Sequence, residues 1–71
     1  MREYTVIYER AEGNYSAYVP DLPGCVACGD TLEETAQLMK EAMELYIDQL
    51  RKDSKPIPEP TTKAGPIAVA V

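Results

Sequence analysis

Side chains in the first part of the chain alternate with a period of two. In residues 3–9 (EYTVIYE) the apolar and aromatic positions repeat on one face, and residues 15–19 (YSAYV) alternate in the same way. The segment between them, RAEGN, contains Gly13 and Asn14, which tolerate the positive φ of a tight turn. We therefore predict two strands, 3–9 and 15–19, joined as a hairpin.

A proline-containing turn follows the second predicted strand. In PDLPG, residues 20–24, neither proline can donate to a sheet ladder, so strand pairing stops there. The next four residues, CVAC at 25–28, are apolar and short, and we predict a third strand over them.

The pattern then changes to helical spacing. Thr31 followed by Glu34 forms a capping box, and acidic residues in the first turn suit the helix dipole. We predict a helix over 32–51, because apolar residues recur there at helical spacing. The predicted buried face consists of Leu32, Ala36, Met39, Met43, Tyr46, Ile47 and Leu50.

The end of the chain combines a stiff connector with an apolar segment. Residues 54–66 are rich in proline and favour an extended connector. Residues 67–71 (IAVAV) alternate, and we predict a last strand there. The fold class is α+β: a small antiparallel sheet of three to four strands with one helix on a face, in the order β-β-β-α-β.

Two groups of apolar residues lie outside this pattern and indicate contact between subunits. Leu38 and Leu45 are off the main helical stripe, where they either widen the core face or meet a second subunit. An apolar strand at a chain end needs a partner, which makes Ile67, Val69 and Val71 candidate interface residues. A chain of 71 residues also builds only a small core, so we expect a homo-oligomer, a dimer or a tetramer.

Charge narrows the range of partners. The net charge is −5, and all of it comes from residues 1–39, since acids and bases cancel after that point. Lys and Arg do not cluster, so we expect no direct binding to nucleic acid, whereas an acidic front half suits a basic partner. The longest apolar runs are too short to span a membrane, and two thiols without a signal peptide indicate a cytoplasmic protein.

The C-x-x-C spacing of Cys25 and Cys28 raises the question of thiol or metal chemistry. A redox cysteine lies at a helix N-terminus, but the predicted helix begins after both thiols, and the neighbouring Asp30 disfavours a thiolate. The sequence contains no histidine, so zinc would need ligands from two chains. We interpret both cysteines as packing residues and expect no metal and no cofactor.

No other motif indicates an enzyme. Without histidine, imidazole-based catalysis is excluded, and no glycine-rich phosphate loop is present. Four carboxylates, at Asp21, Asp30, Glu33 and Glu34, could be imagined as a magnesium site. However, Glu33 and Glu34 diverge on a helix, and capping explains Asp30 and Glu34. A residual metal-dependent nuclease is therefore the weakest hypothesis.

A longer stretch carries a family resemblance. AYVPDLPGC, followed within a few residues by GDTLEE and later by PIPEP, resembles the HicB-like antitoxin family over about residues 5–60. The chain differs from the usual pattern at Ala27 and Cys28, where small polar residues are common. Many family members also carry a C-terminal DNA-binding domain, which this sequence lacks; operon repression by direct DNA contact is therefore not expected.

The resemblance implies a fold and a function. The implied fold is a partial, catalytically degenerate ribonuclease-H-like domain. The implied function is to bind and neutralise HicA, a small basic mRNA-cleaving ribonuclease with a double-stranded-RNA-binding-like fold, by covering its histidine and its RNA-binding surface. This function requires no catalysis by the antitoxin.

Four residues are candidates for contact with such a toxin: Asp21, Leu22, Asp30 and Glu33. Each also has a purely structural explanation: a turn residue, a core residue, a helix cap and a solvated helix face, respectively. A second hypothesis for the whole chain is a free-standing homo-oligomeric scaffold or regulatory module without a toxin. A neighbouring gene for a short basic protein with one essential histidine would favour the antitoxin hypothesis.

Overall fold

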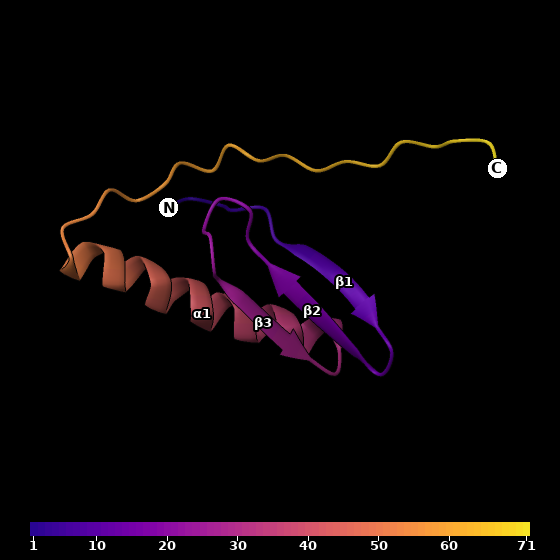
Figure 1. Ribbon diagram of the computed structural model, residues 1–71, viewed down its shortest axis with the longest axis horizontal. Coiled ribbons are helices and arrows are strands. Elements are labelled where there is room, and N and C mark those ends of the chain that lie inside the picture. Colours follow the sequence, from indigo (N-terminus) through magenta and orange to yellow (C-terminus); the bar gives the residue numbers. More distant parts are fainter.

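Three strands and one helix follow one another along the chain. In the computed structural model, which describes residues 1–71, they are β1 (Ile7–Ala11), β2 (Asn14–Tyr18), β3 (Val26–Gly29) and α1 (Leu32–Lys52) (Figure 1). The sheet order is β1-β2-β3, and both strand pairs are antiparallel. The observed order β-β-β-α confirms the predicted α+β class.

The hairpin forms where the alternating pattern predicted it, but the first strand is Ile7–Ala11 and not 3–9, and the second is Asn14–Tyr18 and not 15–19. β1 begins at Ile7 and not at residue 3, because its partner strand ends at Tyr18. Beyond Tyr18 the N–H of Val19 donates to the carbonyl of Cys25, and Pro20 has no N–H to give. Gly13 takes the positive φ of the turn, +81°, and the next residue already belongs to β2.

The helix begins as its capping box predicts. The Thr31 hydroxyl accepts from the N–H of Glu34 at 3.1 Å, and the Glu34 carboxylate accepts from the N–H of Asp30 at 3.4 Å. The buried face differs from the predicted one at its start, since Leu32 and Ala36 are exposed and Thr35 is fully buried. The Thr35 hydroxyl donates to the Thr31 carbonyl at 2.7 Å, so its burial leaves no polar group unpaired.

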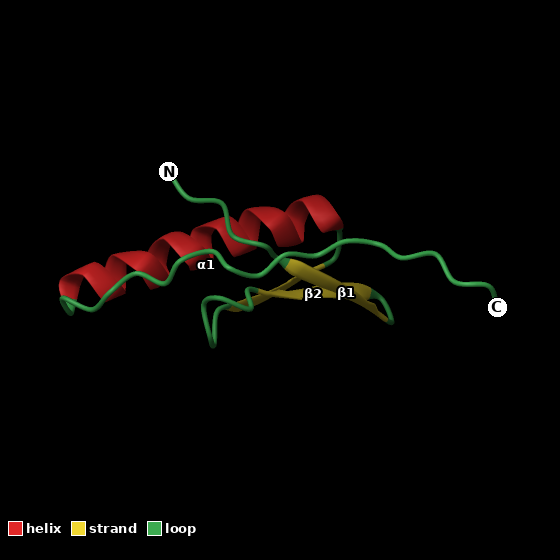
Figure 2. Cartoon of the chain, turned by 90° about the horizontal axis from the view of Figure 1, so that it is seen from above, coloured by secondary structure: helices red, strands yellow, loops and turns green.

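Helix and sheet form two layers around a small core (Figure 2). Only 7 of 71 residues are buried, so the core contributes less stabilisation than that of a larger domain. Leu22, from the turn between β2 and β3, and Met39, from α1, are its largest apolar side chains. The other core members are Ala17, Val19 and Cys25.

The predicted fourth strand is absent from the structure of the single chain. After α1 the chain is extended without regular structure, and residues 63–71 are all exposed. They leave the body of the molecule, so no strand lies within reach to pair with them (Figure 1). A segment with an alternating pattern can form a strand, but only when another strand lies beside it to form hydrogen bonds with its backbone.

Candidate partner-binding surface

Two turns that are distant in sequence lie together at one end of the molecule. One joins β1 to β2, and the other joins β3 to α1 (Figure 1). Between them lies an open depression of about 490 Å³. Two of the predicted contact residues, Asp30 and Glu33, line it together with Arg10, Tyr15 and Leu32. Both carboxylates are on exposed residues, so they are available to a partner.

Acidic side chains predominate at this end. The hairpin adds Glu9 from β1 and Glu12 from the turn, and the first turn of α1 adds Glu34. Arg10 is the one base in these segments. We refer to Glu9, Glu12, Asp30, Glu33 and Glu34 as the acidic end. Sequence reasoning detected the acidity of the front half but not the two hairpin residues, which only the fold brings beside the helix.

The sheet presents an apolar row on the face away from the helix. Ile7 pairs with Tyr18, and Tyr18 pairs with Val26, so the three side chains lie side by side across the strands. Tyr18 is 40% exposed and Val26 is 64% exposed. The next row on this face is formed by Glu9, Ser16 and Cys28. On the face away from the helix, the apolar row is therefore followed by a more polar row, which lies nearer the acidic end.

Asp21, a third predicted contact residue, is occupied within the chain. One carboxylate oxygen accepts from the N–H groups of Thr61 and Thr62, at 3.1 and 3.0 Å. The other accepts from both hydroxyls, at 3.1 and 2.9 Å. The bond from the Thr62 N–H is the main reason that the pKa of Asp21 is lowered; partial desolvation opposes it. Asp21 thus fastens the connector to the turn.

Leu22, the fourth predicted contact residue, is a core residue. It has no exposed surface and packs within the cluster that contains Val19 and Met39. The N–H of Leu22 donates to the carbonyl of Val19, which closes the turn over the core. Its side chain supports the turn from inside, so a direct contact between Leu22 and a partner is not expected from this structure.

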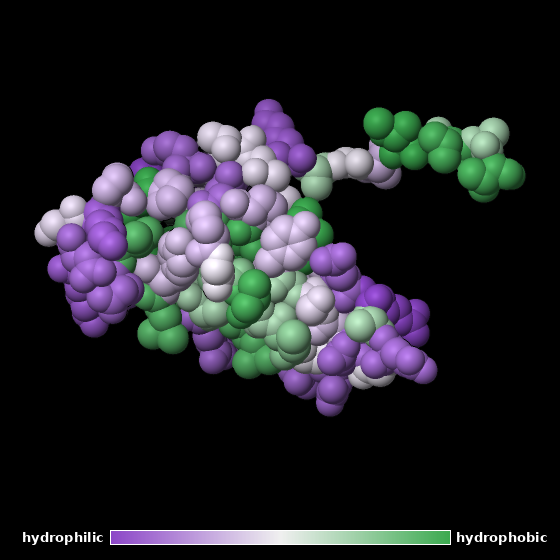
Figure 3. Space-filling view, in the orientation of Figure 1, coloured by the Kyte–Doolittle hydropathy of each residue, from purple (hydrophilic) through white to green (hydrophobic).

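The residues predicted to lie between subunits are all on the surface. Leu45 is 71% exposed and Leu38 is 37% exposed, so neither of them widens the core. Ile67, Val69 and Val71 are also exposed, on a segment that projects from the body (Figure 3). Contact of these residues with another subunit remains a prediction.

The two cysteines occupy different environments. Cys25 is buried in the core, and this burial raises the pKa of its thiol. Cys28 is exposed on the uncovered face of the sheet. Packing therefore describes Cys25, whereas Cys28 is a surface residue, contrary to the interpretation of both as packing residues.

Two further properties of the chain bear on its chemistry. Nowhere do three or more cysteine, aspartate or glutamate side chains come together as a group that could hold a metal ion. The helix α1 is not apolar enough over a sufficient length to cross a membrane.

The sequence matches a family model over residues 4–68, and that model describes the HicB-like antitoxin of bacterial toxin–antitoxin systems. A UPF0150 protein of Synechocystis sp. is 41% identical over 69 residues, which cover 96% of this chain and 87% of that protein. A UPF0150 protein of Thermoplasma acidophilum is 44% identical over 57 residues, 79% of this chain and 83% of the relative.

One relative bears the name of an antitoxin. Antitoxin HicB 2 of Photorhabdus laumondii is 33% identical over 60 residues, which cover 84% of this chain but 43% of that protein. The chain thus spans less than half of the named antitoxin and most of the shorter UPF0150 relatives. Because the family model covers nearly the whole sequence, this protein belongs to the HicB-like antitoxin family of bacterial toxin–antitoxin systems.

Proposed function

We propose that this protein binds and neutralises a small basic toxin of the HicA type, an mRNA-cleaving ribonuclease, by occluding its surface. Membership of the antitoxin family supports a toxin partner. The observation that carries the proposal is the acidic end: Asp30 and Glu33 line the depression, and Glu9, Glu12 and Glu34 are exposed on the hairpin and on the first turn of α1. A surface of this charge attracts a basic protein and raises its rate of association.

The uncovered sheet face supplies the second requirement of such an interface, which is apolar area. Tyr18 and Val26 are exposed beside each other, and aromatic residues are common anchors at the centre of interfaces. Charges at the acidic end would then act at the rim, where they influence the association rate more than the final affinity. Occlusion requires complementary shape and charge but no reaction by the antitoxin.

The proposal is tested with the purified chain and a HicA-type toxin encoded beside it. We expect the toxin alone to cleave mRNA and a stoichiometric amount of this protein to stop the cleavage. Binding without loss of cleavage would overturn occlusion as the mechanism. No binding at low salt would overturn the toxin as the partner.

A pair of double variants tests the acidic end. Asp30→Asn with Glu33→Gln removes two charges there, and Glu41→Gln with Glu44→Gln removes two charges from exposed positions further along the same helix. We expect the first pair to slow association several-fold and to weaken its salt dependence, and the second to do neither. Equal effects of the two pairs would show that only net charge matters.

The exposed apolar segment at the C-terminus favours a second candidate function, a homo-oligomeric scaffold without a toxin. In that case the protein recovered from its native lysate would be a stable oligomer of itself alone, at low and at high salt. Recovery of a small basic protein that cleaves RNA when separated would favour the antitoxin function.

A further inference from the structure

Helix α1 leaves one strand of the sheet uncovered on the helix side. It packs across β2 and β3, and β1 lies beyond it (Figure 1). The result is an open groove of about 1290 Å³ between residues 1–8 and the helix. Much of its wall is apolar, formed by Tyr4, Val6, Tyr8, Met39, Met43 and Ile47.

The same strand has a free edge. β1 is the first strand of the order β1-β2-β3, so one side of its backbone has no ladder partner. Its sequence, IYERA, contains no proline or glycine that would blunt the edge. A free edge beside an apolar groove is a site at which an added strand can form backbone hydrogen bonds and bury side chains at once.

The chain itself contains a segment of matching length and pattern. Residues 67–71 (IAVAV) alternate, which places Ile67, Val69 and Val71 on one face of an extended strand. These side chains are 88%, 73% and 119% exposed, respectively. Figure 3 shows this apolar segment extending away from the body of the molecule. Five residues match the five residues of β1.

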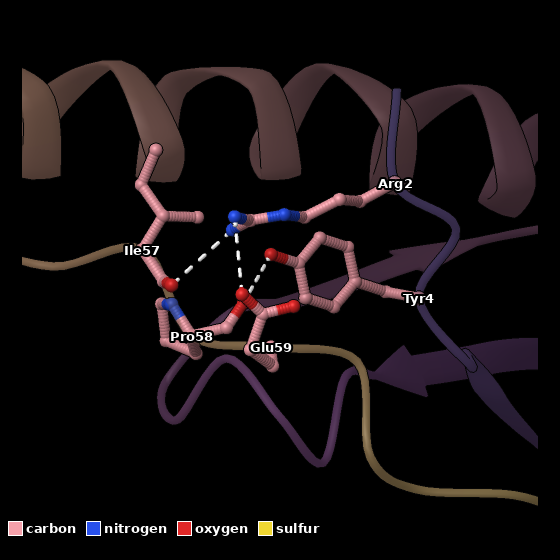
Figure 4. Close-up of polar contacts among 5 residues, drawn as sticks. All are labelled: Arg2, Tyr4, Ile57, Pro58 and Glu59. Atoms are coloured by element: carbon pink, nitrogen blue, oxygen red, sulfur yellow. Dashed lines mark hydrogen bonds and ion pairs between the residues drawn. The ribbon is translucent and has the colours of Figure 1, made fainter.

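Bonds to the connector determine where this segment leaves the body. The Arg2 guanidinium donates to the carbonyl of Ile57 at 3.2 Å and pairs with the Glu59 carboxylate at 3.2 Å. The Tyr4 hydroxyl donates to the carbonyl of Pro58 at 2.6 Å (Figure 4). The Thr5 hydroxyl donates to the carbonyl of Thr62 at 2.8 Å. The connector and the N-terminal segment therefore run in the same direction, side by side.

This arrangement carries the C-terminal segment past the strand of its own chain. The bonded residues are separated by 54 to 57 positions in sequence. Thr62 is the last connector residue that is bonded to the N-terminal segment. Residues 63–71 are all exposed and run away from β1, so the edge of β1 stays free (Figure 1).

We propose that residues 67–71 of a second copy of this chain pair with the free edge of β1. Ile67, Val69 and Val71 of that copy would cover the groove between the N-terminal segment and α1. Since each copy has one such segment and one such edge, mutual exchange closes a symmetric dimer. The exchange provides the fourth strand that the single chain lacks and covers apolar surface that the small core leaves exposed.

Two substitutions in the same segment test the proposal. Val69→Asp places a charge on the face that enters the groove, and Ala68→Asp places the same charge on the opposite face. By analytical ultracentrifugation we expect wild type and Ala68→Asp to have twice the 7.9 kDa mass of one chain, and Val69→Asp to have the mass of a monomer. A monomeric wild type, or equal masses for the two variants, would overturn the proposal.

A labelling experiment distinguishes exchange from pairing within one chain. A nitroxide is attached to a Cys28→Ser, Ala70→Cys chain, because Ala70 is on the face of the segment that points away from the groove. This chain is mixed with a second copy that is labelled with ¹⁵N and carries no nitroxide. We expect broadening of the amide signals of Ile7–Ala11 in the ¹⁵N copy, because the tail of one chain lies against β1 of the other. A dimer without this broadening would show that another surface forms the interface.

Discussion

Asp21 and Thr62 lie 41 positions apart in sequence and are joined by two hydrogen bonds. The N–H and the hydroxyl of Thr62 donate to different oxygens of the carboxylate, at 3.0 and 2.9 Å. An ionised carboxylate suits this position because it only accepts hydrogen bonds, and the four groups that face it, two N–H groups and two hydroxyls, all donate to it. This contact holds the connector against the turn between β2 and β3.

Replacing Asp21 by Ala should release the connector. The methyl group offers no acceptor to the N–H groups and hydroxyls of Thr61 and Thr62. We expect hydrogen exchange at these two amides to accelerate on the order of tenfold, while the amides of α1 keep their protection. Glu59→Gln is the control, since it removes a charge whose ion pair with Arg2 is exposed. Unchanged exchange in Asp21→Ala would show that these bonds do not hold the connector.

The same contact should respond to acid. The pKa of Asp21 is lower in the folded chain than its ordinary value of 3.8, so the unfolded chain takes up a proton first as the pH falls. The stabilisation is therefore complete above the unfolded pKa and is lost as the pH falls through the folded pKa. We expect the amide chemical shifts of Thr61 and Thr62 to titrate together with a midpoint below pH 3.8, and not to titrate in Asp21→Asn. A midpoint at or above 3.8 would contradict this.

Local signals explain which elements the sequence predicts. Thr31 and Glu34 are three residues apart, and their capping box places the start of α1 without reference to the rest of the fold. The turn at Gly13 is equally local. The predicted helix, 32–51, differs from the observed one only at its last residue, Lys52. Each of these features depends on neighbours within a few positions.

The features that the sequence does not predict depend on distant neighbours. The sequence predicts Asp21 to be a turn residue, and nothing near it in the sequence indicates that Thr61 and Thr62 will donate hydrogen bonds to its carboxylate. Leu22 lies between prolines in a turn, yet it is the least exposed apolar residue of the chain. The candidate site also combines local and distant features. The capping box at the start of α1 predicts the position of Asp30 from its sequence neighbours, whereas Glu12 comes to the same end only because the sheet forms.

Gly29 should not tolerate a larger residue. A methyl group at this position would lie 2.7 Å from the hydroxyl of Thr35 and 3.0 Å from its backbone nitrogen. The helix backbone cannot yield without disturbing the capped first turn, so Gly29→Ala should lower the free energy of unfolding by about 1–3 kcal/mol. Urea unfolding followed by circular dichroism measures this. Gly65→Ala is the matched control, because no atom lies within 4 Å of the added methyl there, and it should leave stability unchanged or slightly raised.

Ser54 follows the C-terminus of α1 in a conformation that glycine adopts more easily. Its φ is +54°, and it is the one residue other than glycine with a positive φ. The N–H of Ser54 donates to the carbonyl of Arg51, and the N–H of Lys55 donates to the carbonyl of Leu50. These two bonds form a Schellman motif, in which the left-handed position is usually glycine.

Ser54→Gly should therefore stabilise the protein. Relief of the left-handed strain outweighs the added freedom of glycine in the unfolded chain, so we expect a gain of about 0.5–1 kcal/mol in the free energy of unfolding. Ser54→Val should have the opposite effect, because a β-branched side chain fits this φ poorly. Thermal unfolding of the three proteins gives the order, with glycine above serine and serine above valine. Equal stability of the glycine and serine proteins would show that the strain at Ser54 does not exceed the cost of the added freedom of glycine in the unfolded chain.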